Sequence, residues 1–246
     1  MAYPTQDATD RLMQRGDFAE TSWTLVLAAG KSPSTDTGRA LETLCRLYRP
    51  PVYHYVRRCG HSRHDAEDLT QEFFARILKD NTFARANREK GRFRNYLLAS
   101  LKHFLADEWD KLRAKKRGGG VRPLSLDVDV AEQGYLQVAA SDLTPEKCFD
   151  RQWGLVLLEQ GLKRLRQEFA ADGKVRQFDR LKHFITNEGD QAAYKSVAKE
   201  LGLNAKSLPV TVHRIRKRFK AAVRAELAQT VASPADLEEE LRALFF

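Results

Sequence analysis

The chain has 246 residues, of which 42% are hydrophobic and 30% are charged. This length and composition exclude a wholly disordered chain and a collagen-like one, and they allow one or two packed domains. Lysine and arginine number 42 against 33 aspartates and glutamates, so the net charge is +9 and nucleic acid is a prominent candidate among acidic partners.

The first half of the chain is predicted to be helical. Apolar residues recur at spacings of three and four along the whole sequence, with almost none of the alternation that strands show. One helical region is expected over residues 37–58, with Pro50 and Pro51 interrupting it and Gly60 ending it.

Two more helices are predicted before residue 117. Ser62 followed by Asp65 is typical of a capping box and opens a helix that runs to about residue 79. A long helix is then predicted over residues 92–116. Its apolar stripe consists of Leu97, Leu101, Leu105, Trp109 and Leu112.

Residues 118–143 are predicted to be a flexible linker. They begin with three successive glycines and show little periodicity. A second helical block follows, because Thr144 and Pro145 are typical of a capping residue and the first position of a helix. Helices are predicted there over residues 145–171 and 174–186.

The end of the chain holds three further predicted helices. Asp190 can cap a short helix that ends at Leu201, and Gly202 breaks it. A basic helix is expected to start near Leu208 or Pro209, because a proline one turn inside an earlier start would meet a backbone carbonyl. A last short acidic helix is predicted after a capping serine at position 233.

These elements predict an all-α fold of two small helical domains joined by a flexible linker, the second containing a helix-turn-helix. The expected parts are a first domain at 1–117, the linker at 118–143, a second domain at 144–231 and a C-terminal helical extension at 232–246.

Positive charge is concentrated in two segments, residues 111–122 and 210–225, that contain no acids. Neither carries the opposite charges at i+4 that a merely solubilising helix tends to have, so nucleic-acid contact is favoured over a solvated face. The second segment follows a helix–glycine–helix pattern typical of a helix-turn-helix. Its apolar stripe is Leu208, Val212, Ile215, Phe219, Val223 and Leu227, and its opposite face carries Thr211, Arg214, Lys217, Arg218 and Arg224.

Aromatic residues accompany the first basic segment. Aromatic side chains beside positive charge can hold the unstacked bases of single-stranded DNA. We expect Phe104 and Trp109 in the core, because they lie near the apolar stripe. Phe93 and Tyr96 fit the core and DNA contact equally well.

Acidic residues gather on the helix that starts after Ser62, although the chain is basic. Asp68 and Glu72 share one face of it, whereas Asp65 and Glu67 point apart. A protein-binding face is therefore favoured over a metal-dependent catalytic site.

Other cofactor and catalytic motifs are missing from the sequence. Two histidines near Cys59 match no standard zinc spacing, and there is no P-loop, dinucleotide-binding or nucleophile-elbow motif. We expect no cofactor, no metal and no catalytic residue. With no secretory signal pattern, no apolar stretch long enough for a membrane helix and three cysteines in no CxxC pair, we expect a cytoplasmic protein without membrane insertion.

Three stretches resemble bacterial RNA polymerase sigma factors of the extracytoplasmic-function (ECF) group. The core-polymerase-binding segment of that group is similar to the stretch DAEDLTQEFFARIL of this chain, which follows LCRLYRPPVYHYVRRCGHSRH. The promoter-melting and minus-ten-reading segment is similar to GRFRNYLLASLKHFLADEWDKLRAKKRGGG. The helix-turn-helix that reads the minus-thirty-five element is similar to YKSVAKELGLNAKSLPVTVHRIRKRF. The resemblance covers about residues 20–244.

The resemblance implies a transcription initiation factor, not an enzyme, that directs core RNA polymerase to specific promoters and assists promoter melting. Its implied polymerase contacts are Asp65, Asp68, Gln71, Glu72 and Phe73. Its implied contacts with melted and minus-ten DNA are Phe93, Asn95, Tyr96, Lys111, Arg113, Lys115, Lys116 and Arg117. Its implied contacts with the minus-thirty-five duplex are Thr211, His213, Arg214, Lys217 and Arg218. An anti-sigma factor is a further candidate partner.

Two other functions remain open at this point. A stand-alone helix-turn-helix regulator would bind its operator without polymerase. A metal-dependent nuclease or transposase-like enzyme would cleave DNA when Mg²⁺ is added.

Overall fold

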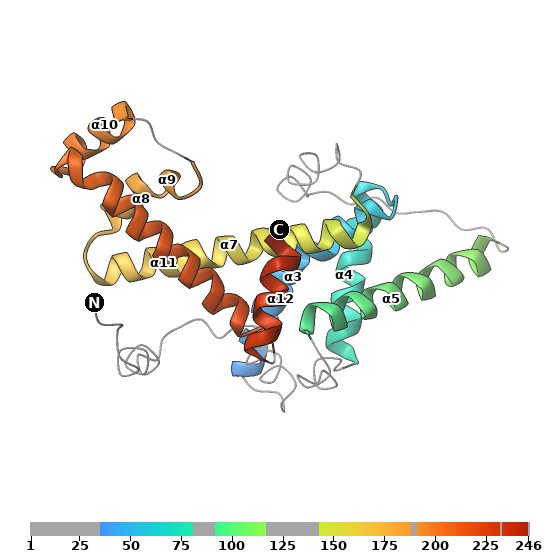
Figure 1. Ribbon diagram of the computed structural model, residues 1–246. Helices are drawn as coiled ribbons and strands as arrows, with labels where there is room; N and C mark the ends of the chain where they lie inside the picture. The colour runs from blue at the N-terminus through green and yellow to red at the C-terminus, as the bar shows by residue number, and fades with distance from the viewer. Residues whose placement is uncertain (1–34, 81–91, 117–142, 188–190, 232, 246) are drawn as a thin grey trace.

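The computed structural model describes residues 35–80, 92–116, 143–187, 191–231 and 233–245. Every regular element in these ranges is a helix, which confirms the predicted all-α class. Figure 1 shows the helices in chain order, and their labels are used below. In these ranges we find no helix that is both long enough and apolar enough to cross a membrane.

Helix α3, Thr35–Arg58, is continuous through Pro50 and Pro51. The predicted interruption at these prolines is therefore wrong. Tyr48 before them and Val52 after them are both buried in the same hydrophobic cluster. Packing on both sides of the prolines thus stabilises a helix that loses backbone hydrogen bonds at these positions.

Helix α4, Arg63–Lys79, begins as the capping box predicts. The hydroxyl of Ser62 accepts a hydrogen bond from the backbone N–H of Asp65 at 3.2 Å and donates one to its carboxylate at 2.8 Å. Helix α5, Phe93–Lys116, also has the predicted extent. Together with α3, these two helices supply most of the first hydrophobic cluster.

Helix α7, Pro145–Ala171, starts at the Thr144 cap and contributes to two hydrophobic clusters. In its first half, Trp153 stacks on Tyr48 of α3 with ring centroids 4.5 Å apart. In its second half, Leu165 is buried in the second cluster. The expected domain boundary at residue 144 therefore does not coincide with the border between the two clusters.

The second cluster is completed by short helices and one long helix. The region predicted as a single helix over 174–186 is split into α8, Val175–Leu181, and α9, His183–Thr186. Helix α10, Gln191–Leu201, ends before Gly202, whose φ of 65° lies in the left-handed region that glycine adopts readily.

Helix α11, Leu208–Ala228, follows a short 3₁₀ turn, η3, Ala205–Ser207. The later helix start inferred from Pro209 is confirmed, since Pro209 lies in the first turn of α11. All six residues of the predicted apolar stripe are buried: Leu208, Val212, Ile215, Phe219, Val223 and Leu227.

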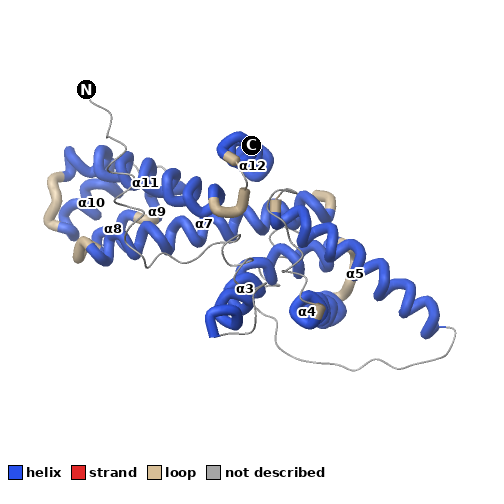
Figure 2. The backbone as a smooth tube through the Cα atoms, turned by 90° about the horizontal axis from the view of Figure 1, so that it is seen from below, coloured by secondary structure: helices blue, strands red, loops and turns tan. Residues whose placement is uncertain are grey.

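Helix α12, Pro234–Phe245, begins at a capping box formed by Ser233 and Asp236. It contacts α7 and α11. Figure 2 shows it end-on at one edge of the molecule. Arg76 of α4 lies 2.7 Å from Asp107 of α5, and beyond this ion pair the end of α5 extends away from the other described helices.

Candidate functional site

The outer face of α4 carries polar and acidic side chains. Asp68, Gln71 and Glu72 are exposed, and Asp65 is half-buried beside its cap. The opposite face of the helix is buried in the first cluster. Helical geometry thus places the carboxylates of Asp68 and Glu72, four residues apart, on one accessible surface.

Phe73 does not belong to that surface. Its side chain is 1% exposed, and its ring meets Phe74 edge-on at 5.5 Å. Among the residues expected to contact polymerase, Phe73 is therefore a core residue, and Asp65, Asp68, Gln71 and Glu72 are accessible. Phe73 shares a helical face with the buried Ile77, which lies four residues further on.

Glu67 is a buried acid that the sequence did not assign. It forms an ion pair with Arg49 of α3 and accepts a hydrogen bond from Gln71 Nε2 at 3.2 Å. A buried carboxylate needs such partners, because its desolvation is costly. Glu67 therefore ties α4 to α3 and offers no free charge.

Phe93 at the start of α5 is fully buried. Its ring packs edge-on against Tyr48, with centroids 5.2 Å apart. Phe93 is thus unavailable for stacking on a base, which corrects its expected DNA contact. Asn95 is exposed and Tyr96 is half-buried, so these two remain accessible at this end of the helix.

The other end of α5 is open. Trp109, expected in the core, is 56% exposed, whereas Phe104 is buried as expected. Lys111 is exposed, and its Nζ lies 2.5 Å from Glu108, a hydrogen bond that raises the pKa of the lysine. The side chains of Arg113, Lys115 and Lys116 and the whole of Arg117 lie outside the described residues.

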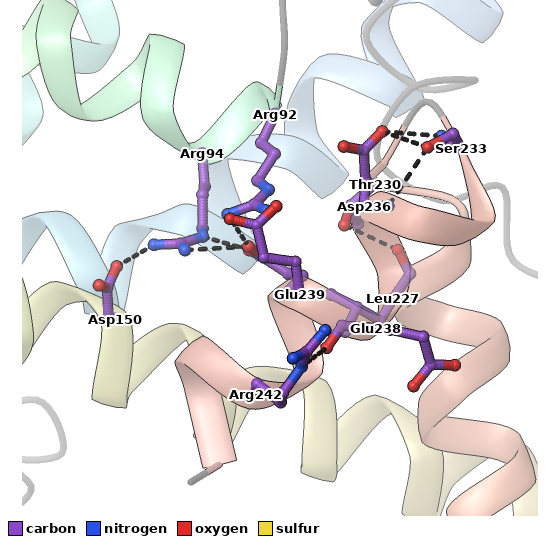
Figure 3. Close-up of polar contacts among 11 residues, drawn as sticks. Arg92, Arg94, Asp150, Leu227, Thr230, Ser233, Asp236, Glu238, Glu239 and Arg242 are labelled. Carbon is purple, nitrogen blue, oxygen red and sulfur yellow. Dashed lines mark hydrogen bonds and ion pairs between the residues drawn. The ribbon is translucent and has the colours of Figure 1, made fainter.

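An ion-pair network joins the start of α5 to α12 and α7 (Figure 3). Arg94 pairs with Asp150 of α7 and donates to Glu240 of α12, with 3.0 Å between Nη2 and Oε2. Arg92 lies 2.7 Å from Glu240 and 2.9 Å from Glu239. Arg94 and Glu240 are buried, and burial raises the pKa of Asp150 although Arg94 opposes the shift.

Sequence reasoning missed this network. Arg94 and Glu240 are 146 residues apart, so no local sequence pattern links them. The one available signal is compositional: Glu238, Glu239 and Glu240 are consecutive in a helix that was predicted to be acidic.

Helices α10 and α11 are joined by a short segment that contains Gly202 and η3. The exposed face of α11 presents His213, Arg214 and Lys217, and among the described residues neither Arg214 nor Lys217 has an acidic partner. Thr211 is half-buried and donates a hydrogen bond from its hydroxyl to the carbonyl of Ser207 at 3.1 Å.

Other bases of α11 have acidic partners on neighbouring helices. Arg218 lies 2.9 Å from Glu168 of α7, and its guanidinium carbon lies 4.7 Å from the centroid of the Phe169 ring. Arg224 pairs with Glu238 of α12. The basic segment has no acids in sequence, but the fold supplies them, so part of the positive face is neutralised.

A hollow of about 880 Å³ lies beside this face, between α11 and α12. Apolar side chains including Phe219 and Leu241 line it together with bases such as Arg216 and Lys220. As for metals, the described part of the chain brings together no group of three or more His, Cys, Asp or Glu side chains that could hold an ion.

Comparisons with known proteins relate the first cluster to a family. Residues 44–115 match the sigma-70 region 2 family, a range that takes in most of α3, all of α4 and nearly all of α5. The chain is 25% identical over 193 residues to the ECF RNA polymerase sigma factor SigE of Mycolicibacterium smegmatis. That match covers 78% of this chain and 65% of the relative, less than two thirds of its length. No solved structure matches the chain significantly.

Proposed function

We propose that the chain is a transcription initiation factor of the ECF-type sigma factors, because residues 44–115 match the sigma-70 region 2 family and the chain is similar to an ECF sigma factor. It binds core RNA polymerase, directs the polymerase to specific promoters and assists promoter melting. It works in the cytoplasm, catalyses no reaction itself, and has an anti-sigma factor as a further candidate partner. The observation that carries the proposal is an exposed acidic face on α4 inside the region that matches region 2.

Helix α4 is the proposed polymerase-binding element. Asp68 and Glu72 are exposed, and an exposed carboxylate is negatively charged at neutral pH. Such carboxylates fit a basic partner surface, where charge complementarity selects the partner and speeds association. The buried opposite face of α4 holds the helix against α3, so the acids are presented on a fixed element.

Helix α5 is the proposed element for melted and minus-ten DNA. Asn95 and Tyr96 offer an amide and a partly open ring near its start, which suit hydrogen bonding and stacking with an unstacked base. The basic residues near its end, Lys111, Arg113, Lys115, Lys116 and Arg117, suit phosphate contact. The exposed Trp109 adds a stacking surface among them.

Helix α11 is the proposed reader of the upstream duplex, with α10 as the first helix of a helix-turn-helix. Thr211, His213, Arg214 and Lys217 lie within the first half of α11, the part that such a helix inserts into the major groove. Arg218 contributes charge near the phosphates while it is paired with Glu168.

Transcription by a reconstituted holoenzyme tests the proposal. Core RNA polymerase mixed with this chain and genomic DNA should start transcripts at discrete sites, and core polymerase alone should not. Discrete starts that disappear when Asp68→Lys and Glu72→Lys are combined would support α4 as the contact. If the chain instead bound an operator tightly without polymerase and gave no starts, the proposal would be wrong and a stand-alone regulator would replace it.

A further inference from the structure

We propose that α12 is an autoinhibitory latch in which Glu239 and Glu240 occupy Arg92, a phosphate-binding residue of the promoter surface that is released when α12 moves away. The inference rests on the proposed function. It adds a DNA-binding residue to those named above, and it gives the C-terminal helix a regulatory role.

Arg92 depends on α12 for its neutralisation. Both ion pairs that it makes among the described residues are with α12, at 2.9 Å to Glu239 and 2.7 Å to Glu240. Arg94 differs, because it also pairs with Asp150 of α7 and keeps that partner if α12 leaves. Departure of α12 therefore frees the charge of Arg92 in particular.

Arg92 is placed where a phosphate contact would be useful. It directly precedes α5, and it lies within four residues of the accessible Asn95 and Tyr96 in the proposed melting surface. A guanidinium binds carboxylates and phosphates with the same planar fork of N–H donors. The two glutamates therefore stand in for DNA phosphate oxygens (Figure 3).

The neighbouring glutamate repeats this arrangement on the second proposed DNA-binding helix. Glu238 pairs with Arg224 of α11, so three consecutive glutamates of α12 each contact an arginine on α11 or at the start of α5. One short acidic helix thus covers bases on both elements that are proposed to bind promoter DNA. If α12 only stabilised the fold, its three glutamates would not all need to pair with arginines of the proposed DNA-binding elements.

The attachment of α12 is suited to release. Its apolar residues Leu237, Leu241 and Leu244 are only half-buried, whereas Glu240 is 1% exposed. Charged contacts therefore account for a large share of its docking, and a polyanion such as DNA competes for the same arginines. Helix α12 packs mainly on α7 and α11 rather than on α4, the proposed polymerase contact, so DNA is the proposed releasing ligand.

Binding of the full chain to DNA without polymerase tests the latch. The probe is a fluorescent duplex of arbitrary sequence with an unpaired bubble, because phosphate binding is independent of sequence. Combining Glu239→Gln with Glu240→Gln should tighten binding several-fold and steepen the slope of log affinity against log salt by about one. Adding Arg92→Ala to this double variant should remove the gain.

The matched control combines Glu42→Gln with Glu159→Gln, two exposed glutamates on α3 and α7. It changes the net charge by the same amount and should leave the affinity unchanged. Because Glu240 is buried, its replacement can unfold the protein; Glu239→Lys, at a side chain that is 68% exposed, should then give the same gain in a folded chain, as judged by circular dichroism.

Two results would overturn the latch: no gain in affinity in a folded latch variant, or a gain that persists without Arg92. Either result, obtained while the wild-type holoenzyme starts transcripts at discrete sites, removes the latch and leaves the proposed function standing. A wild-type chain that gives no discrete starts removes the proposed function and the latch with it.

Discussion

Gly161 lies where α7 and α11 pack together. A Cβ at this position would lie 3.3 Å from the Phe219 ring and 2.6 Å from Val223 Cγ2, and the second distance is closer than packed carbon atoms approach. We expect Gly161→Ala to lower the free energy of unfolding by about 1–3 kcal/mol, because the second cluster must shift to make room. Urea denaturation monitored by circular dichroism measures this change.

Gly38 on α3 is the matched control for this substitution. A Cβ there would meet nothing within 4 Å, and the residue is helical and exposed. Gly38→Ala should therefore raise stability by up to about 1 kcal/mol, through helix propensity alone. If Gly161→Ala raised stability as Gly38→Ala should, the close approach at Gly161 would not be limiting.

Glu226 gives stability a pH dependence. Burial raises its pKa, and Arg164 at 3.2 Å only partly opposes the shift. A carboxyl whose pKa is raised by folding stabilises the protein fully below its unfolded pKa, and that contribution is lost as pH rises through the folded pKa. Glu226→Gln has no such loss, so its unfolding free energy relative to wild type should increase between about pH 4 and pH 7.

Unfolding of wild type and Glu226→Gln at both pH values checks this expectation. A difference between the two proteins that stayed constant with pH would contradict it. Glu159→Gln serves as the control, because Glu159 is exposed on the same helix as Arg164.

At the scale of the helix, α4 combines a buried face with an acidic one. Asp68→Lys together with Glu72→Lys should abolish binding of core polymerase, because charge reversal at an interface brings like charges together and costs several kcal/mol. The fold should survive, since both side chains are exposed. Co-purification with core polymerase is the measurement, with thermal unfolding as the check on folding.

A double reversal elsewhere controls for net charge. Glu42→Lys with Glu159→Lys makes the same charge change on α3 and α7, at side chains that are also exposed, and should leave co-purification intact. An equal drop in polymerase binding in both double variants would show a nonspecific effect of charge.

The basic side chains of α11 differ in whether an acid on another helix pairs with them. Arg214→Ala with Lys217→Ala should lower the salt slope of promoter binding by about two in the polymerase complex, because each replacement leaves one DNA phosphate without its cation. Neither residue has an acidic partner among the described residues, so stability should not change. An unchanged slope would mean that this face is only solvated.

Arg218→Ala should behave differently, although the residue adjoins Lys217. It removes the ion pair with Glu168 and the packing on the Phe169 ring, so part of its effect falls on stability. The triple replacement of Arg214, Lys217 and Arg218 would mix the two effects, and the double variant keeps them apart.

Local signals in the sequence predicted much of this fold. The capping residues Ser62 and Thr144 indicated the starts of α4 and α7, because a cap acts on backbone groups of the next turn. Pro209 placed the start of α11 for a similarly local reason. Helix starts that depend on neighbours within a few residues could therefore be predicted from the sequence.

Features that depend on contacts between residues far apart in the sequence could not be predicted from it. Packing on both sides of Pro50 and Pro51 keeps α3 continuous, and Trp109 is 56% exposed although it continues the apolar stripe of α5. On the candidate site, Asp68 and Glu72 are exposed, whereas Phe73 and Phe93 belong to the core. Periodicity places a residue on a face but does not say which faces a partner helix will bury.

At the scale of the molecule, α7 and α12 tie the two clusters together. Phe149 and Trp153 of α7 are buried in the first cluster, although they follow the linker in sequence. Glu240 of α12, near the end of the chain, pairs with Arg94 at the start of α5. The first and second hydrophobic clusters thus share elements, although the sequence predicts two domains joined by a flexible linker.

This sharing predicts the behaviour of a chain cut in its linker. Cleavage at a protease site introduced between Gly118 and Leu143 should leave two fragments that elute together, because Trp153 stays stacked on Tyr48 and Arg94 stays paired with Glu240. The isolated fragment 1–117 lacks the α7 side of its core and should bind a hydrophobic dye. Adding fragment 143–246 should remove that dye binding. Gel filtration and dye fluorescence are the measurements. Two fragments that elute separately, each with its own cooperative unfolding transition, would instead support independent domains. A fragment that folds alone does not need the interface with the other fragment.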